Sequence, residues 1–395
     1  MKKAPKFWGP FLFWGAEIPF PDSVKVTDEL QRRRVADLIG TGRWENPAMK
    51  MKRLVFVVGM ACVVAASVGA QQKQKVIIDT DPGTDDAMAI LLALNSPELQ
   101  VEAFTAVPGN VVAKQSLENA LKLVSVAGRC DVPVAAGAQH PLMQKTYTAT
   151  YWHGKNGLAD IELPPSKCKA DPRFAPDLII ELVHKYPHEI TLIPIGPLTN
   201  IALAVSKDPS IVGLVKDIVI MGGSISGGNV DGAAEANIFG DPEAAQIVFN
   251  AGWMVTMVGS DVGERTLIRR KHLAQLELGH GPQNDVVTKI ARFYIERSEK
   301  NGWDGAAMYD PLAVATVIDP KLVTLKDMHV DVETRGEFTR GETVANRMGA
   351  NEKNVLHGDH YEIEGYETLK NNARVCLGSD AERFLQMFIS RVKDK

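Results

Sequence analysis

Four carboxylates stand within eight consecutive positions, in the run Asp79-Thr80-Asp81-Pro82-Gly83-Thr84-Asp85-Asp86. Two like charges about 4 Å apart repel by about 4 kcal/mol at an effective dielectric of about 20, so this crowding needs compensation. A helix beginning at Asp85 supplies part of it, because exposed backbone N–H groups favour negative charge. One aspartate here would be an ordinary helix cap, but four indicate a bound hard cation such as Ca²⁺ or Mg²⁺.

The elements that position these carboxylates alternate between short β-branched runs and amphipathic stretches. This alternation predicts one α/β domain with a mostly parallel, doubly wound (Rossmann-like) sheet flanked by helices, in which ligands bind beyond the carboxyl ends of the strands. A small antiparallel hairpin is expected over Asp327–Val344, and a closing helix over Ser379–Val392. The expected strands are Lys75–Asp79, Leu99–Val107, Ile190–Ile195, Ile218–Met221 and Met254–Val258, with early helices at about 85–94 and 113–127.

Composition limits the possible partners. The 395 residues are 45% hydrophobic and carry a net charge of −4. We find no basic stripe interleaved with aromatic residues, so a nucleic-acid partner is not expected. The four cysteines lack zinc-binding spacing. Cys130 and Cys168 are either bridged, as an oxidising compartment allows, or buried thiols like Cys376.

Residues 51–70, MKRLVFVVGMACVVAASVGA, have the layout of a signal peptide: Lys52 and Arg53, then an apolar run, then small residues. The run is too short for a stable membrane span; a buried or membrane-anchoring helix is the alternative. We expect translation to begin at Met49 or Met51, residues 1–50 to be an unfolded upstream extension, and residues 71–395 to form the mature domain. The protein would then be periplasmic or secreted, or cytoplasmic if the segment is not processed.

The aspartate run by itself also permits a different enzyme. A DxD sequence after a strand is typical of phosphatases that form an aspartyl-phosphate with magnesium. Such an enzyme would need a strand-end Ser or Thr and a later Lys to hold the phosphoryl group, and no clear pair stands out.

A family resemblance narrows the choice. Residues 76–94, VIIDTDPGTDDAMAILLAL, resemble the N-terminal signature of the inosine–uridine preferring nucleoside hydrolases. The similarity covers roughly residues 75–320 well and the remainder loosely. Further motifs follow in family order: Val107–Asn110, His153–Leu158, Ile195–Asn200, Met221–Gly223, Asn229, Glu235–Phe239, Asp241–Ala245 and Asp310–Val314.

The resemblance implies hydrolysis of ribonucleosides to free base and ribose by a calcium-activated water, with Asp81 as general base. It also implies a homodimer or homotetramer. The implied calcium ligands are Asp81, Asp86, Asp310 and the main-chain carbonyl of Ile195. The implied ribose contacts are Asp85, Asn110, Met221, Asn229, Glu235, Asn237 and Asp310; for Met221, a plain core position is the alternative. A secreted nucleoside-binding protein without activity remains the non-enzymatic alternative.

The residues that would contact the nucleobase are less clearly indicated than those that would bind the metal and the ribose. His153 is expected to contact the base, although a lone histidine is often structural, and Trp152 and Trp303 either stack on the base or belong to the core. Many family members carry a histidine just before the last calcium aspartate, where it protonates the leaving base. This chain has Tyr309 there, and an unperturbed pKa of about 10 makes tyrosine a poorer acid. Base preference is therefore left open.

Overall fold

The computed structural model describes residues 72–345 and 370–395. The upstream extension predicted for residues 1–50 and the signal peptide predicted for 51–70 lie outside the described residues. Within the described ranges, no helix combines the length and apolar character needed to cross a membrane.

Eight strands form the main sheet, in the order β3-β2-β1-β4-β5-β6-β12-β9. All neighbouring pairs are parallel except β12 and β9. The order reverses between β1 and β4, which is the topological switch point where doubly wound sheets bind ligands. These strands are β1 Gln74–Thr80, β2 Leu99–Ala106, β3 Val134–Ala136, β4 Ile190–Pro194, β5 Asp217–Met221, β6 Val255–Val258, β9 Val323–Met328 and β12 Ala373–Ser379.

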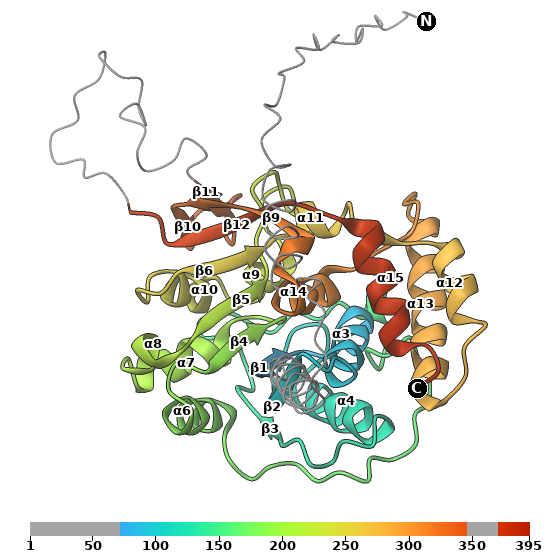
Figure 1. Ribbon diagram of the computed structural model, residues 1–395. Coiled ribbons are helices and arrows are strands. Elements are labelled where there is room, and N and C mark those ends of the chain that lie inside the picture. The colour runs from blue at the N-terminus through green and yellow to red at the C-terminus, as the bar shows by residue number, and fades with distance from the viewer. Residues whose placement is uncertain (1–71, 346–369) are drawn as a thin grey trace, which may run out of the picture. The chain divides into compact units, whose positions relative to one another are not determined.

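Helices cover both faces of this sheet (Figure 1). The helices of eight or more residues are α3 Thr84–Leu94, α4 Ala113–Val126, α6 Ala175–Lys185, α7 Thr199–Lys207, α10 Pro242–Phe249, α13 Pro282–Lys300, α14 Tyr309–Ile318 and α15 Ala381–Val392. The shorter ones are α5 Thr150–His153, α8 Ile211–Leu214, α9 Ala236–Gly240, α11 Ser260–Gly263, α12 Arg270–Leu276 and the 3₁₀ helix Pro320–Leu322.

Two hydrophobic cores lie on opposite faces of the sheet, because successive strand side chains point to opposite sides. On β1, Val76 and Ile78 pack in the core with α3, α13, α14 and α15. Ile77 between them packs in the other core, with α6, α7 and α10. The predicted α/β class and parallel sheet are thereby confirmed, and most predicted elements agree with the observed ones within two residues.

The C-terminal part differs from its prediction. The expected hairpin over Asp327–Val344 contains a real antiparallel pair, β10 Val330–Val332 with β11 Thr343–Ala345. Its first residues instead belong to β9, which pairs with β12 at the edge of the main sheet. The predicted closing helix begins at Ala381 rather than Ser379, because Ser379 still pairs with Val323 as the last residue of β12. One further small pair joins β7 Leu267–Ile268 to β8 Ala306–Ala307.

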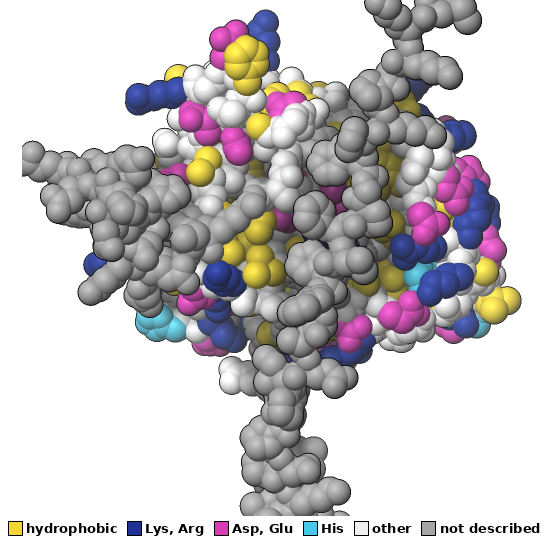
Figure 2. All heavy atoms as spheres, turned by 90° about the horizontal axis from the view of Figure 1, so that it is seen from above, with side chains coloured by type: hydrophobic (Ala, Val, Ile, Leu, Met, Phe, Trp, Pro, Cys, Tyr) yellow, Lys and Arg dark blue, Asp and Glu magenta, His cyan; other side chains and the backbone are white. Residues whose placement is uncertain are grey.

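Cys130 and Cys168 form a disulfide with a Cα–Cα distance of 5.0 Å, which decides between the two alternatives left open by the sequence. Cys376 is a buried free thiol, and burial raises its pKa to about 11. On the face seen in Figure 2, acidic and basic side chains are interspersed rather than gathered by sign.

Candidate active site

The aspartate run lies at the switch point of the sheet. Asp81 follows β1, Asn110 follows β2, and Ile195 follows β4, so that all three stand at the carboxyl ends of neighbouring parallel strands. Asp310 reaches the same place from the first turn of α14, which packs against α3. A hydrophobic strand, a Pro-Gly turn and a helix start therefore carry the acids to the place where the fold binds ligands.

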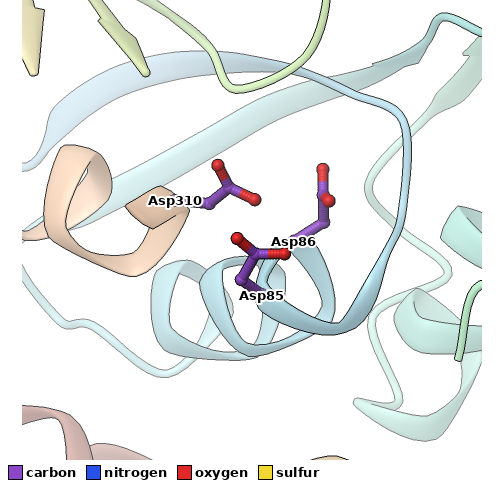
Figure 3. A group of neighbouring side chains, drawn as sticks. All are labelled: Asp85, Asp86 and Asp310. Atoms are coloured by element: carbon purple, nitrogen blue, oxygen red, sulfur yellow. The ribbon is translucent and has the colours of Figure 1, made fainter. Parts of the chain in front are cut away.

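Three carboxylates meet closely enough to hold a metal ion. One oxygen each from Asp85, Asp86 and Asp310 lies within 4.8 Å of the others, and all three residues are buried. Figure 3 shows the three side chains converging from the start of α3 and from α14. The ligand set implied by the family resemblance contains Asp81 in place of Asp85, beside Asp86 and Asp310.

Asp81 nevertheless belongs to the same charge cluster. Burial raises the pKa of Asp81 well above its ordinary value, and the carboxylates of Asp86 and Asp85 raise it further. Burial and the same neighbours raise the pKa of Asp310 in the same way. Acids that are buried together cannot all ionise without a counter-charge, because each charge opposes the next. A divalent cation would supply that counter-charge.

Two carboxylate oxygens in the cluster are available to bind a cation. Asp81 Oδ1 and Asp85 Oδ1 are buried and have no hydrogen-bond partner among the described residues. Buried polar atoms are nearly always paired, so an orphaned carboxylate oxygen indicates a missing partner. An all-oxygen donor set fits Ca²⁺ or Mg²⁺ and does not fit the softer transition metals.

The other oxygens are fixed by the protein. Asp81 Oδ2 accepts a hydrogen bond from the Asn110 backbone N–H at 2.5 Å. A Cβ at Gly109 or Gly196 would lie 2.0 Å or 2.6 Å from the Asp81 carboxylate. Both loops can therefore close over Asp81 only because they carry glycine at these positions. The carboxylate is held in one orientation, with Oδ1 left over.

Asp86 is held even more firmly. Its Oδ1 accepts from Thr80 Oγ1 at 2.6 Å, and its Oδ2 accepts from the Gly83 N–H at 2.9 Å and Asn110 Nδ2 at 3.0 Å. These bonds fold the Pro-Gly turn back onto the start of α3. Residues of the same turn therefore help to fix the orientation of the Asp86 carboxylate.

A second polar group joins the ends of β4 and β5. Asn237 Nδ2 donates to the carbonyl oxygens of Ile195 and Met221, both at 3.1 Å. Glu235 caps α9 and accepts from the backbone N–H groups of Asn237, Ile238 and Gly223. Burial raises the pKa of Glu235 to about 7, although these three bonds oppose the shift.

A cavity of about 320 Å³ opens beside the carboxylates. Ten of the twelve site residues predicted from sequence line it, whereas Asp81 and Asp86 are not part of the lining but accept hydrogen bonds from Asn110, which is. The ten are Asp85, Asn110, His153, Ile195, Met221, Asn229, Glu235, Asn237, Tyr309 and Asp310.

Aromatic side chains form much of the remaining wall. Trp152 and Trp303, for which stacking and core positions were both open, line the cavity together with Tyr147, Tyr151 and Tyr294. The three tyrosines were not predicted. Tyr294 occupies an apolar position of α13 that reads as core, and Tyr147 lies in a polar loop without periodicity. Only the shared cavity identifies them.

His153 stands at the border between the acids and the aromatic wall. Its Nδ1 accepts from the Thr84 backbone N–H at 3.1 Å, so the neutral ring carries its proton on Nε2. Burial lowers the pKa of His153 to about 4, against the opposing charge of Asp86. Within the described part of the chain, Nε2 has no hydrogen-bond partner, which leaves an N–H donor in a residue that lines the cavity.

Tyr309 lies at the first position of α14, directly before Asp310. It lines the cavity, as Asn229 does. Burial and the charge of Glu264 raise the pKa of the phenol, so it stays protonated at neutral pH. A neutral phenol is a hydrogen-bond donor.

The chain is similar to known proteins over most of its length. Residues 76–386 match the family model described as inosine-uridine preferring nucleoside hydrolase. The chain is 43% identical over 266 residues to uridine nucleosidase 1 of Arabidopsis thaliana, covering 67% of this chain and 79% of that protein. It is 44% identical over 276 residues to the inosine-uridine preferring nucleoside hydrolase of Crithidia fasciculata, covering 69% and 87%. A solved plant nucleoside hydrolase superposes with a TM-score of 0.75 at 36% identity, covering 82% of this chain and 99% of that one.

Proposed function

The chain belongs to the inosine-uridine preferring nucleoside hydrolase family, and on that premise we propose that its cavity hydrolyses ribonucleosides with Ca²⁺ as cofactor and Asp81 as general base. The family acts on N-glycosyl compounds, so its membership argues against the phosphatase considered above. Turnover of a ribonucleoside would separate the enzyme from the inactive binding protein. One observation supports the mechanistic part: Asp81 and Asp85 each present a buried carboxylate oxygen without a hydrogen-bond partner, beside the carboxylates of Asp86 and Asp310.

The proposed ligands of the cation are Asp81, Asp86, Asp310 and the main-chain carbonyl of Ile195, with Asp85 close enough to contribute. Mixed carboxylate and carbonyl oxygens suit the loose coordination of Ca²⁺ better than the strict octahedron of Mg²⁺. When bound, such an ion lowers the pKa of a coordinated water and neutralises the charge of the cluster.

Asp81 is the proposed proton acceptor. Its Oδ2 is held by Asn110 while Oδ1 has no protein partner, so one oxygen remains for the proton of the attacking water. As this water forms a bond to the anomeric carbon, the bond from that carbon to the base nitrogen breaks through an oxocarbenium-like state. The electron pair of the broken bond leaves with the base.

Recognition of ribose falls to the polar residues around the Asp81 carboxylate. The proposed contacts are Asp85, Asn110, Asn229, Glu235, Asn237 and Asp310, with Met221 packing against the sugar. Each side chain is oriented by a hydrogen bond within the protein or by burial, so little ordering remains to be done on binding. Sites of this type discriminate strongly in favour of substrates that carry the matching hydroxyl groups.

Tyr309 and His153 are the proposed donors to the departing base. Tyr309 is a neutral phenol, and His153 has its proton on Nε2, so each can donate a hydrogen bond without changing its charge. The aromatic wall would stack on the base. The relatives from Arabidopsis thaliana and Crithidia fasciculata are both named for uridine, so uridine is the first substrate to test.

The assembly and the compartment are proposals as well. We propose a homodimer or homotetramer, and a mature domain of residues 71–395 released from a signal peptide at 51–70 into the periplasm or the exterior. The disulfide between Cys130 and Cys168 supports an oxidising compartment. Peptide mapping of the natural protein tests this: a first peptide near Gln71 is expected, and peptides from residues 1–50 would contradict it.

The decisive experiment uses the purified protein and uridine. After treatment with a chelator, ribose release should stop; Ca²⁺ should restore it, and the ion should be measurable in the restored protein. Full activity in the continued presence of chelator would exclude the metal mechanism. Absence of ribose release from every ribonucleoside tested would exclude the hydrolase.

A further inference from the structure

The ring of Tyr309 rests on a glycine. Gly263 is the last residue of α11, a short buried helix that follows β6 and contacts α14. A Cβ at Gly263 would lie 2.1 Å from Tyr309 Cδ1 and 2.8 Å from Cε1, and 3.2 Å from Cγ. These atoms belong to the body of the ring, so no small movement of a flexible tip relieves the overlap.

The backbone at Gly263 gives no other reason for a glycine. Its φ lies outside the left-handed region, where a Cβ would be strained. Its N–H donates to the Gly259 carbonyl at 3.2 Å, and its carbonyl accepts from the Thr266 N–H at 2.9 Å, as any residue at the end of a helical turn could. The three atoms nearest to the position of a Cβ at Gly263 all belong to the ring of Tyr309.

The phenol of Tyr309 carries the donor that matters. A phenol has one O–H donor, which it can give to an acceptor on a bound ligand. With the ring seated against Gly263, this donor belongs to a residue of the cavity wall.

We infer that Gly263 is a positioning residue for leaving-group activation: its lack of a side chain seats Tyr309 so that the phenol O–H reaches the departing base. The inference rests on the proposed function, since it presupposes that a base departs in this cavity. By this inference, a residue of α11 helps to decide which leaving groups the site accepts.

The test is Gly263→Ala, measured with uridine and with p-nitrophenyl riboside, whose leaving group departs without a proton. With uridine, kcat should fall by about tenfold or more, since a displaced donor forfeits part of a contribution of about 10²–10⁴. With the nitrophenyl substrate the loss should stay below about threefold. Gly213→Ala is the matched control, because a Cβ there meets nothing within 4 Å, and both activities should match wild type.

Introducing the same substitution into a Tyr309→Ala variant separates a positioning effect from a general loss of structure. In Tyr309→Ala the ring is absent, so adding Gly263→Ala should change neither activity nor the thermal midpoint further. If Gly263→Ala alone does not fold, the double variant should still fold like Tyr309→Ala. An unchanged ratio of the two substrates in Gly263→Ala, or equal losses with and without the ring, would overturn the inference. Wild-type protein that releases no ribose from either substrate would instead overturn the proposed function itself.

Discussion

The two ends of the cavity are built in different ways. At the carboxylate end, Asp81 and Asp86 are 1% and 0% exposed, and every proposed metal ligand stands at a strand end or a helix start beside the switch point. At the aromatic end, Tyr151 and Trp303 are 56% and 40% exposed and come from the long segment after β3 and from the turn after α13. The proposed sugar chemistry would thus depend on the sheet, and the proposed base recognition on the segments that connect its elements.

The difference has a physical reason. Positioning a metal and a nucleophile requires fixed oxygens, and strand ends locked by hydrogen bonds provide them. Base selection requires shape and stacking, which surface connections can vary without disturbing the sheet. Substitutions at the carboxylate end should therefore affect all substrates alike, whereas those at the aromatic end should depend on the base.

The largest effect is expected for Asp81→Asn, which keeps the shape but removes the proton acceptor and one metal ligand. We expect kcat to fall by about 10⁴, the upper end of a general-base contribution. Steady-state rates on uridine and on the nitrophenyl substrate should fall together. Asp131→Asn, at a surface pair with Arg129, is the control and should retain full activity. A loss confined to uridine would show that Asp81 serves the base and not the water.

The next largest effect is expected for a substrate that lacks the 2′-hydroxyl group of the ribose. Because buried polar groups would be left unpaired, 2′-deoxyuridine should have a kcat/KM at least about 100-fold below that of uridine. Competition between the two in one assay measures the ratio directly. Equal rates would contradict the ribose contacts proposed for Asp85 and its neighbours.

Tyr309→Phe should act on the aromatic end alone. Loss of the phenol O–H should reduce turnover of uridine by about ten- to a hundredfold, at or below the lower end of acid catalysis, and leave the nitrophenyl substrate nearly unaffected. The ratio of the two kcat values is the quantity to measure. Equal losses would remove Tyr309 from leaving-group activation and assign it to packing.

The smallest effect is expected for Trp303→Ala. Loss of ring stacking worth about 0.5–1.5 kcal/mol should raise KM for uridine by about three- to tenfold with kcat little changed. Phe338→Ala, 82% exposed and outside the cavity lining, is the control. A large fall in kcat for Trp303→Ala would mean that the two ends of the cavity are not independent.

The sequence alone indicated the carboxylate end, because Asp81, Asp85 and Asp86 lie within six consecutive positions and local hydrogen bonds from Thr80 and Gly83 orient Asp86. Asp79 of the same run differs, since it belongs to β1 and accepts from Thr105 and Asn200. The sequence alone also indicated the parallel sheet, since strand and helix periodicities repeat along the chain. Asn110, Ile195, Glu235 and Asn237 were proposed only through resemblance to the family, since no local pattern marks them as site residues; the structure shows that they line the cavity.

The tertiary structure decided what depends on distant segments. It brought Asp310 together with Asp85 and Asp86, joined Cys130 to Cys168, placed β12 between β6 and β9 in the sheet, and brought Gly263 against the ring of Tyr309. Each of these contacts joins residues separated by a loop or a crossover, or depends on side-chain orientation. The periodicity of the sequence indicates on which face of a helix or strand a residue lies, but not which residue it contacts. These contacts are decided only when the elements pack together.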